Sequence, residues 1–274
     1  MNAPAIDVSD VCCIFGSQTV LSQVSLRIAA GETVAIVGES GCGKSVTMKV
    51  MMQLLRPTSG KLEWFGRDVE TLSSIERQQQ RLRLGYLFQG AALFDSLTIY
   101  ENVAFGMRQT GEQNEQHIRQ TVLERLDEVG LSTEIIMKRP SEISGGMQKR
   151  VGLARALALS PDVMFYDEPT TGLDPVNSRR IDDLIHSVGQ SRGVTGIIVT
   201  HDLRTVQRVA DRIVMLYPRA RLPDGVGQII FDGSLQELAA SSDERVREYI
   251  GDEFETKTAT GAETERQQTL LKSA

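Results

Sequence analysis

The first segments of the chain alternate between apolar and polar residues, as strands with one buried face and one wet face do. Residues 6–15 alternate loosely, residues 20–28 alternate more clearly, and Gly16 and Ser17 form the turn between them. Residues 61–65, which lie between two glycines, are a third short segment of this kind. The pattern therefore predicts three strands of an antiparallel sheet.

A second group of segments is mainly apolar and indicates buried strands. These segments cover residues 33–37, 83–89, 161–168 and 196–200. Two more, residues 212–216 and 228–231, indicate a closing hairpin whose loop is long and rich in proline and arginine. We therefore expect an α/β fold in which an antiparallel sheet lies beside a parallel one.

Helical spacing of apolar residues marks three further segments. Residues 46–55 have it, and a proline and a glycine follow where that helix should end. Residues 115–131 carry their apolar side chains on one face, and residues 145–159 are helical as well. Because the last two segments lie between predicted strands, we interpret residues 96–160 as a helical subdomain within a domain that covers residues 4–250.

The composition is that of an ordinary globular protein. With 274 residues, of which 41% are hydrophobic and 24% charged, the chain is long enough for one large domain with a subdomain. Its net charge of -6 gives no support for a nucleic-acid surface, so we expect no nucleic-acid partner. The three cysteines have no metal-ligand spacing, which predicts a reducing compartment without a disulfide framework.

Neither end of the chain predicts a targeting or membrane-spanning segment. No apolar run approaches the roughly 18 residues that a membrane span needs. The N-terminus lacks the basic region and apolar core of a signal peptide. Residues 251–274 are polar, and we expect a mobile tail or one that folds on a partner. The sequence thus predicts a soluble cytosolic protein, whose membrane role would come through a partner.

One stretch adds chemistry to these elements. The strand at 33–37 is followed by Gly38, Glu39, Ser40, Gly41, Cys42, Gly43, Lys44, Ser45 and Val46. Residues 38–45 fit the phosphate-loop pattern G-x-x-x-x-G-K-[ST] between a strand and a helix. The backbone N–H groups of such a loop surround an anion, while Lys44 reaches the β- and γ-phosphates and Ser45 ligates Mg²⁺. A glycine-rich turn with a surface lysine is the alternative, and the flanking strand and helix argue against it.

Polar side chains end several predicted strands. Gln89 ends one strand, and Asp167 and Glu168 end a second. His201 follows a third, where it could contact the γ-phosphate or cap a helix at the surface. Such strand ends face the ligand of an open α/β sheet, so the acids could hold Mg²⁺ and deprotonate the attacking water. Phe15, just before a turn, could stack on adenine or belong to the core.

Together these motifs resemble those of the ATP-binding subunits of ABC transporters. The most specific one, Ile143-Ser-Gly-Gly-Met-Gln148, resembles the signature LSGGQ of that family. Gly172-Leu173-Asp174 resembles the D-loop, and Asp167-Glu168 ends a strand that resembles Walker B. Gln89, His201 and Phe15 match the Q-loop, the switch histidine and the adenine-stacking aromatic. The resemblance covers roughly residues 4–250, and its two departures in the signature are Ile143 for Leu and Met147 for Gln.

The resemblance implies a P-loop NTPase fold, with a RecA-like core, an antiparallel β subdomain and a helical insertion. It implies ATP and Mg²⁺ as ligands, the metal being held by Ser45, Gln89 and Asp167. Glu168 would be the general base, and His201 would hold the γ-phosphate and the water in line. In the family, the signature and D-loop complete the ATP site of a second copy. A homodimer is therefore implied, in which ATP is contacted across the interface by Ser144, Gly145, Gly146 and Asp174.

A finer resemblance concerns the cargo. Residues 90–103 and 146–150 are similar to those of ATPases from MCE-type lipid transporters, the Mla phospholipid system among them. Many ABC importers carry Pro-His where Asp95 and Ser96 stand. This resemblance implies a permease partner, an MCE-type lipid-binding protein and a position on the cytoplasmic face of the inner membrane. The ATPase of an amino-acid or metal importer is the alternative within the family.

Two rival classes fit the sequence less well. A chromosome-maintenance ABC ATPase carries a long coiled-coil insertion, whereas only 123 positions separate Lys44 from Asp167. Ribosome-associated ABC factors carry two cassettes, and this sequence contains one. A GTPase would carry the guanine-reading motif N-K-x-D, which does not occur. The sequence therefore predicts a transport ATPase.

Overall fold

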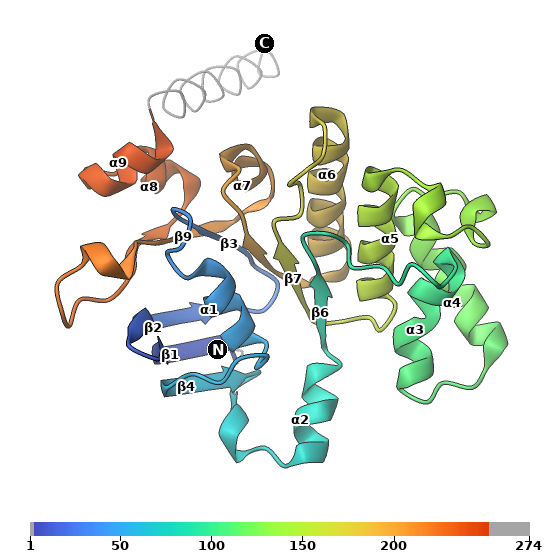
Figure 1. Cartoon of the computed structure of the whole chain (residues 1–274), viewed down its shortest axis with the longest axis horizontal. Helices are drawn as coiled ribbons and strands as arrows, with labels where there is room; N and C mark the ends of the chain where they lie inside the picture. Colours follow the sequence, from blue (N-terminus) through green and yellow to red (C-terminus); the bar gives the residue numbers. More distant parts are fainter. Residues whose placement is uncertain (1–2, 252–274) are drawn as a thin grey trace, which may run out of the picture.

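Two sheets organise the computed structural model, which describes residues 3–251 (Figure 1). The first sheet is antiparallel, with strand order β2-β1-β4-β5. Its strands are β1 (Ile6–Phe15), β2 (Gln18–Ile28), β4 (Ser59–Trp64) and β5 (Arg67–Asp68). Burial alternates along the second half of β2, because one face packs on the core and the other faces water. The three strands predicted from alternation are thus confirmed, and β5 adds a short fourth.

The second sheet has the strand order β10-β9-β3-β8-β7-β6. Its strands are β3 (Thr33–Val37), β6 (Leu84–Leu87), β7 (Val163–Asp167), β8 (Thr195–Val199), β9 (Arg212–Leu216) and β10 (Ile229–Gly233). Neighbours from β9 to β6 pair in parallel, and β10 pairs antiparallel with β9. The predicted combination of an antiparallel and a parallel sheet is confirmed. Since parallel strands end at one edge, the carboxyl ends of β3, β6, β7 and β8 lie along the same edge.

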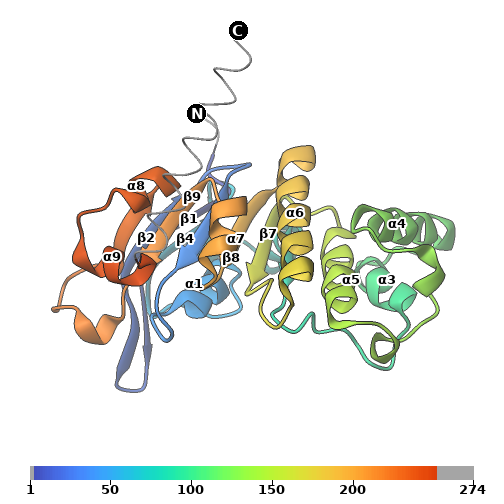
Figure 2. The same cartoon turned by 90° about the horizontal axis from the view of Figure 1, so that it is seen from above.

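Helices cover both faces of the second sheet. The α-helices of residues 3–251 are α1 (Lys44–Met51), α2 (Ser74–Arg81), α3 (Ile99–Gln109), α4 (Glu115–Glu128), α5 (Gly145–Leu157), α6 (Pro175–Arg192), α7 (Leu203–Val209), α8 (Leu235–Ala239) and α9 (Glu244–Ile250). Figures 1 and 2 both place α3, α4 and α5 at one end of the molecule and α8 and α9 at the other. The predicted helical insertion is therefore the group α3 to α5, which the chain forms between β6 and β7.

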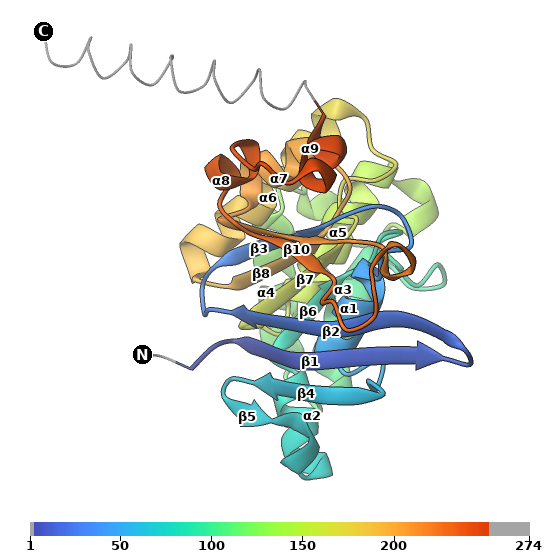
Figure 3. The ribbon, with the colours of Figure 1, turned by 90° about the vertical axis from the view of Figure 1, so that its left-hand side faces the viewer.

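Three apolar clusters hold these layers together. The first lies between the antiparallel sheet, α1 and one face of the second sheet, and includes Met48, Trp64 and Phe165. Figure 3 shows β1, β2 and β4 of the antiparallel sheet side by side. The second cluster joins the opposite face of that sheet to α3, α4, α5 and α6. The third joins β9 to α7, α8 and α9. Because the helical group shares a close-packed core with β6 and β7, a displacement of one is resisted by the other.

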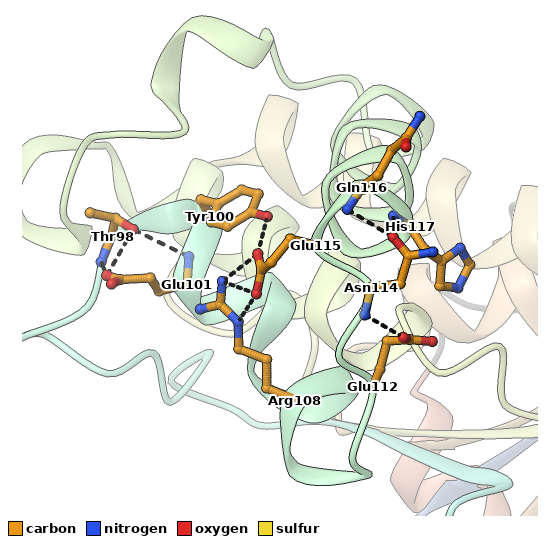
Figure 4. Close-up of polar contacts among 9 residues, drawn as sticks. All are labelled: Thr98, Tyr100, Glu101, Arg108, Glu112, Asn114, Glu115, Gln116 and His117. Carbon is orange, nitrogen blue, oxygen red and sulfur yellow. Dashed lines mark hydrogen bonds and ion pairs between the residues drawn. The ribbon is translucent and has the colours of Figure 1, made fainter.

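A polar cluster closes the hairpin between α3 and α4 (Figure 4). Arg108 of α3 pairs with Glu115 of α4 at 3.0 Å, and the hydroxyl of Tyr100 donates to Glu115 at 3.5 Å. Asn114 caps α4, because its side chain accepts two backbone N–H groups of the first turn. Since water screens the partly exposed Arg108–Glu115 pair, the apolar cluster beneath it stabilises the hairpin more than the pair does.

The predicted C-terminal ends of three helices were wrong. The helix expected at 46–55 ends at Met51, because Gln53 has a left-handed backbone with φ 52°. The helices expected at 115–131 and 145–159 end at Glu128 and Leu157, two or three residues early. Helix α6 was not predicted, although Ile181, Leu184, Ile185 and Val188 have helical spacing and three of the four are buried.

The described chain ends shortly after α9, at Gly251. Residues 252–274, which belong to the polar tail that we expect to be mobile, lie outside the described residues. Within residues 3–251, no helix has both the length and the apolar character that crossing a membrane requires.

Candidate functional site

The phosphate-loop residues form a tight turn between β3 and α1. Gly43 has φ 102° and is the N-cap of α1, and a Cβ atom there would lie 2.5 Å from Leu21 Cδ2. At Gly38, where φ is 139°, a Cβ atom would lie 2.2 Å from the carbonyl oxygen of Leu216. Both positions therefore require glycine, and the turn presents the unpaired N–H groups at the start of α1 to a ligand.

A cavity of about 360 Å³ lies beside this turn. The ammonium of Lys44 donates to the carbonyl oxygens of Gly38 at 2.7 Å and of Glu39 at 2.9 Å, so its side chain lies across the loop. The cavity is lined by Val20, Ser40, Gly41, Gly43, Lys44, Ser45, Val46, Gln89, Asp167, Glu168 and His201. The fold thus brings the loop together with the polar residues that follow β6, β7 and β8.

Glu168 and His201 interact on the wall of this cavity. His201 Nδ1 lies 2.9 Å from Glu168 Oε1, and the hydroxyl of Thr171 donates to Glu168 Oε2 at 3.0 Å. Glu168 has φ 46°, which is uncommon for a residue other than glycine. Its backbone N–H donates to the carbonyl oxygen of Val199 at 2.8 Å, so β8 holds this turn. Both carboxylate oxygens are therefore fixed, as a general base requires.

A tyrosine that no sequence pattern singles out orients Asp167. The hydroxyl of Tyr86, in β6, donates to Asp167 Oδ2 at 2.8 Å. Burial, reinforced by the hydrogen bond to Asp167 and by its charge, raises the pKa of Tyr86 well above its ordinary value, so the phenol remains a donor. Asp167 shares the cavity with the oxygen donors of Ser45 and Gln89. Such a set fits Mg²⁺, which takes few carboxylates and fills its shell with phosphate oxygens and water.

The other predicted ATP contacts lie outside this cavity. Ser144 caps α5, whose first turn contains Gly145 and Gly146, and Asp174 caps α6. Ser144 and Asp174 are exposed, and each side chain accepts backbone N–H groups from the first turn of its own helix. Phe15 ends β1 and is 46% exposed, so it is not a core aromatic. The fold of one copy therefore does not bring the signature and D-loop residues to the cavity.

Two loop residues have their own partners elsewhere in the chain. Glu39 pairs with Arg221, from the loop between β9 and β10, at 2.7 Å. The carbonyl oxygen of the buried Cys42 accepts from Gln228 Nε2 at 3.3 Å, and Gln228 Oε1 accepts from the N–H of Ser22 at 2.6 Å. Gln228 is fully buried and ties the phosphate loop to β2. No local pattern marks it, because its partners lie 186 and 206 positions away.

Comparison with known proteins agrees with this geometry. Residues 21–171 match the family described as ABC transporter. The chain is 38% identical over 246 residues to the probable ribonucleotide transport ATP-binding protein mkl of Mycobacterium leprae, covering 90% of this chain and 68% of that protein. It is 35% identical over 250 residues to the intermembrane phospholipid transport system ATP-binding protein MlaF of Haemophilus influenzae, covering 91% of each.

A solved structure has the same fold. The dimeric structure of MJ0796, a bacterial ABC transporter cassette, matches with a TM-score of 0.74 at 29% identity, covering 84% of this chain and 98% of that one. The predicted fold class, an α/β P-loop NTPase with a helical insertion, is thereby confirmed. The family match also spans the phosphate loop, the signature segment and the acids after β7. The chain belongs to the ABC transporter family, as one of its ATP-binding and ATP-hydrolysing subunits.

Proposed function

We propose that this subunit powers the transport of phospholipid or a related lipid, acting with a membrane permease and an MCE-type lipid-binding protein. Two relatives support a lipid cargo. MlaF is named for intermembrane phospholipid transport, and a protein of Arabidopsis thaliana that is 38% identical over 260 residues is named after the glycolipid trigalactosyldiacylglycerol. Asp95 and Ser96, in the segment after β6, agree with that group. The mkl protein is named for ribonucleotide transport, which is the competing cargo.

Hydrolysis is assigned to the pair Glu168 and His201, and their 2.9 Å contact beside Lys44 is the observation that carries this assignment. Glu168 takes a proton from the water that attacks the γ-phosphorus, while His201 orients the γ-phosphate. The bond from the γ-phosphorus to the bridging oxygen breaks, which leaves ADP and phosphate. Lys44 and the N–H groups of the loop stabilise the charge on the phosphate oxygens. Mg²⁺ held by Ser45, Gln89 and Asp167 would neutralise charge on the β- and γ-oxygens.

A second copy of the chain completes each site in this proposal. Ser144, Gly145 and Asp174 are exposed at helix starts away from the cavity, so they are free to meet a nucleotide bound by another copy, and the buried Gly146 follows Gly145 in the first turn of α5. The N-terminal N–H groups of α5 favour an anion such as the γ-phosphate. Phe15 is exposed enough to stack on adenine. The MJ0796 cassette, whose solved structure is dimeric, supports a homodimer.

The helical subdomain is the proposed contact with the permease. Residues 90–98 connect Gln89 in the cavity to the start of α3, so a change at the nucleotide reaches the helical group directly. We assign residues 96–160 to this subdomain and residues 4–250 to the whole ATPase domain. Through the permease, the subunit would lie on the cytoplasmic face of the inner membrane, as a peripheral protein.

The test of cargo is to express the chain with its native neighbouring genes and purify the membrane complex in detergent. Bound molecules are then identified by mass spectrometry, and ATPase activity is measured with and without the permease. Copurified phospholipid, with activity that depends on the permease, supports the proposal. Recovery of a solute-binding protein for amino acids or metals, or of nucleotides other than ATP and ADP, without lipid, overturns the cargo and leaves the ATPase assignment intact.

A further inference from the structure

Helix α5 runs from the signature residues toward the chain's own cavity. It starts at the N-cap Ser144, and its buried side includes Lys149, Val151, Gly152 and Leu153. Lys149 follows Ser144 by five positions, which is an axial rise of about 7.5 Å along a helix. The helix packs closely on β6 and the segment after it, because a Cβ atom on Gly152 would lie 3.1 Å from Leu87 and 3.2 Å from Ala91. A displacement of the Ser144 end is therefore carried along α5.

Lys149 is the residue of α5 that reaches the turn after β7. Its ammonium donates to the backbone carbonyl oxygen of Glu168 at 3.2 Å, and the residue is 5% exposed. Burial lowers the pKa of Lys149, and the carboxylates of Asp167 and Glu168 oppose that shift. Within residues 3–251, Lys149 forms no ion pair, and its hydrogen bond goes to the backbone. Burying a cation without a close counterion costs free energy of folding, so we look for a role of Lys149 beyond packing.

The turn that Lys149 contacts is the one that aims the catalytic carboxylate. Glu168 adopts φ 46°, and its carbonyl oxygen also accepts the N–H of Thr171 at 3.2 Å. Its own N–H is bonded to Val199, so the peptide groups on both sides of the Cα atom are held. Because χ angles are measured from the backbone, rotation of this turn would swing the carboxylate away from His201. A strained backbone at such a position persists only where neighbours hold it.

We propose that Lys149 is a positioning residue for Glu168, and that through α5 it couples the general base to the signature end of the same helix. This inference rests on the proposed roles of Glu168 and Ser144. When Ser144 engages the nucleotide of a second copy, α5 is fixed, Lys149 holds the Glu168 carbonyl, and the carboxylate is aimed at the attacking water. When the signature is not engaged, the Ser144 end of α5 lacks that contact, so the bond between Lys149 and the Glu168 carbonyl is held less firmly and the base is less well aligned.

The first test is Lys149→Met, which removes the charge and the donor while keeping an unbranched side chain. We expect the ATPase kcat of the purified dimer to fall about 10- to 100-fold, because a displacement of about 1 Å at a catalytic group has that effect. The Kd for ATP should change less than about twofold, because Lys149 does not line the cavity. Lys149→Arg should restore at least part of kcat, since it keeps a cationic donor.

Arg150→Met is the matched control on the same helix. Arg150 is a partly buried cation that donates to the carbonyl oxygens of Gly130 at 2.8 Å and Val129 at 3.4 Å, at the end of α4 and away from Glu168. Its removal should lower the melting temperature as much as Lys149→Met does, yet leave kcat within about twofold. Equal losses of kcat in the two variants would mean that Lys149 serves packing alone, and would overturn the proposal.

A second measurement asks whether Lys149 acts through Glu168. In a Glu168→Gln background, single-turnover hydrolysis should fall less than about twofold further when Lys149→Met is added, because effects that share one group are not additive. A full additional 10- to 100-fold loss would show that Lys149 acts elsewhere. If Lys149→Met does not fold, Lys149→Gln is measured in the same way, and normal kcat in that variant overturns the proposal. If instead the proposed role of Glu168 as general base is wrong, the result is different, because Glu168→Gln alone would then hydrolyse ATP normally.

Discussion

The two groups of residues that we propose as ATP contacts, the cavity half and the exposed half, are built in different ways. Glu168 and His201 in the cavity contact each other from segments 33 positions apart, and the N–H of Glu168 is bonded to Val199 of β8, while Lys44 is held by carbonyl oxygens of its own loop. Ser144 and Asp174, in contrast, are exposed and bind the first turns of their own helices. Side chains that the fold holds in place can contact a ligand only at that place. An exposed helix N-terminus, in contrast, can bind an anion that another molecule brings to it. In the proposed function, one copy therefore binds ATP in its cavity and a second copy encloses it.

Glu168→Gln tests the cavity half most directly. The amide cannot take the proton from water, so we expect turnover to fall roughly 10²- to 10⁴-fold while ATP binding stays intact. Phosphate release and ATP titration measure the two quantities, and size exclusion should detect an ATP-bound dimer. Glu134→Gln, at an exposed position of the helical group, serves as the control. Normal turnover of Glu168→Gln would remove Glu168 from the role of base.

Ser144→Arg tests the exposed half. The new side chain should block the approach of a second copy, so each monomer still binds ATP but turnover falls about 100-fold, in the range seen when one donor to a developing charge is lost. The rate should also lose its cooperative dependence on ATP. Unchanged cooperative hydrolysis would contradict the division of the site between two copies.

Lys44→Ala should also affect the cavity half, but it should weaken the binding of ATP, which Glu168→Gln leaves intact. Loss of a charge-assisted contact to phosphate corresponds to a roughly 10- to 100-fold larger Kd for ATP. Isothermal titration on the monomer measures this value. Lys49→Ala, an exposed lysine on the same helix, is the matched control and should bind ATP normally. Equal effects of the two substitutions would argue that charge in general, and not the position of Lys44, matters.

Tyr86→Phe sharpens the comparison within the cavity, since it removes one hydroxyl and little volume. Without the 2.8 Å hydrogen bond, Asp167 is less well oriented, and we expect the Mg²⁺ concentration for half-maximal activity to rise about tenfold. The Kd for ATP measured without Mg²⁺ should not change. An unchanged Mg²⁺ requirement would mean that the tyrosine does not support the metal site.

Asp182→Asn tests the stability of α6, the helix that Asp174 of the exposed half caps. Burial raises the pKa of Asp182, in α6, to about 6, although a weak contact with Arg208 at 3.4 Å opposes the shift. The folded protein thus keeps a proton that the unfolded chain releases near 3.8, so stability falls as pH rises from about 4 to 6. The loss is at most about 3 kcal/mol. The free energy of unfolding is measured with urea at several pH values. It should change less with pH in Asp182→Asn than in the unsubstituted protein, and turnover should be unchanged.

The parts of the fold that sequence predicts are those with a local cause. The phosphate loop needs consecutive residues with a strand before and a helix after, and the strand at 33–37 was predicted to the residue. Alternation marks β1 and β2 because each has one wet face. Helix α6 has such a cause as well, because Ile181, Leu184, Ile185 and Val188 form an apolar stripe at helical spacing, but the prediction did not include it. Helix ends were missed where a single backbone conformation, as at Gln53, stops the helix.

The sequence by itself determined the family, the phosphate loop and the candidates at the strand ends, because motifs and periodicity are properties of neighbouring residues. Only the tertiary structure decided which of these residues meet. Parallel pairing of β3, β8, β7 and β6 brings Gln89, Asp167 and His201 to one edge, while Ser144 remains on another surface. The same packing gives Glu168 its partner Lys149 and Cys42 its partner Gln228. Such contacts join residues far apart in the chain, and their geometry exists only once the sheet and helices are packed.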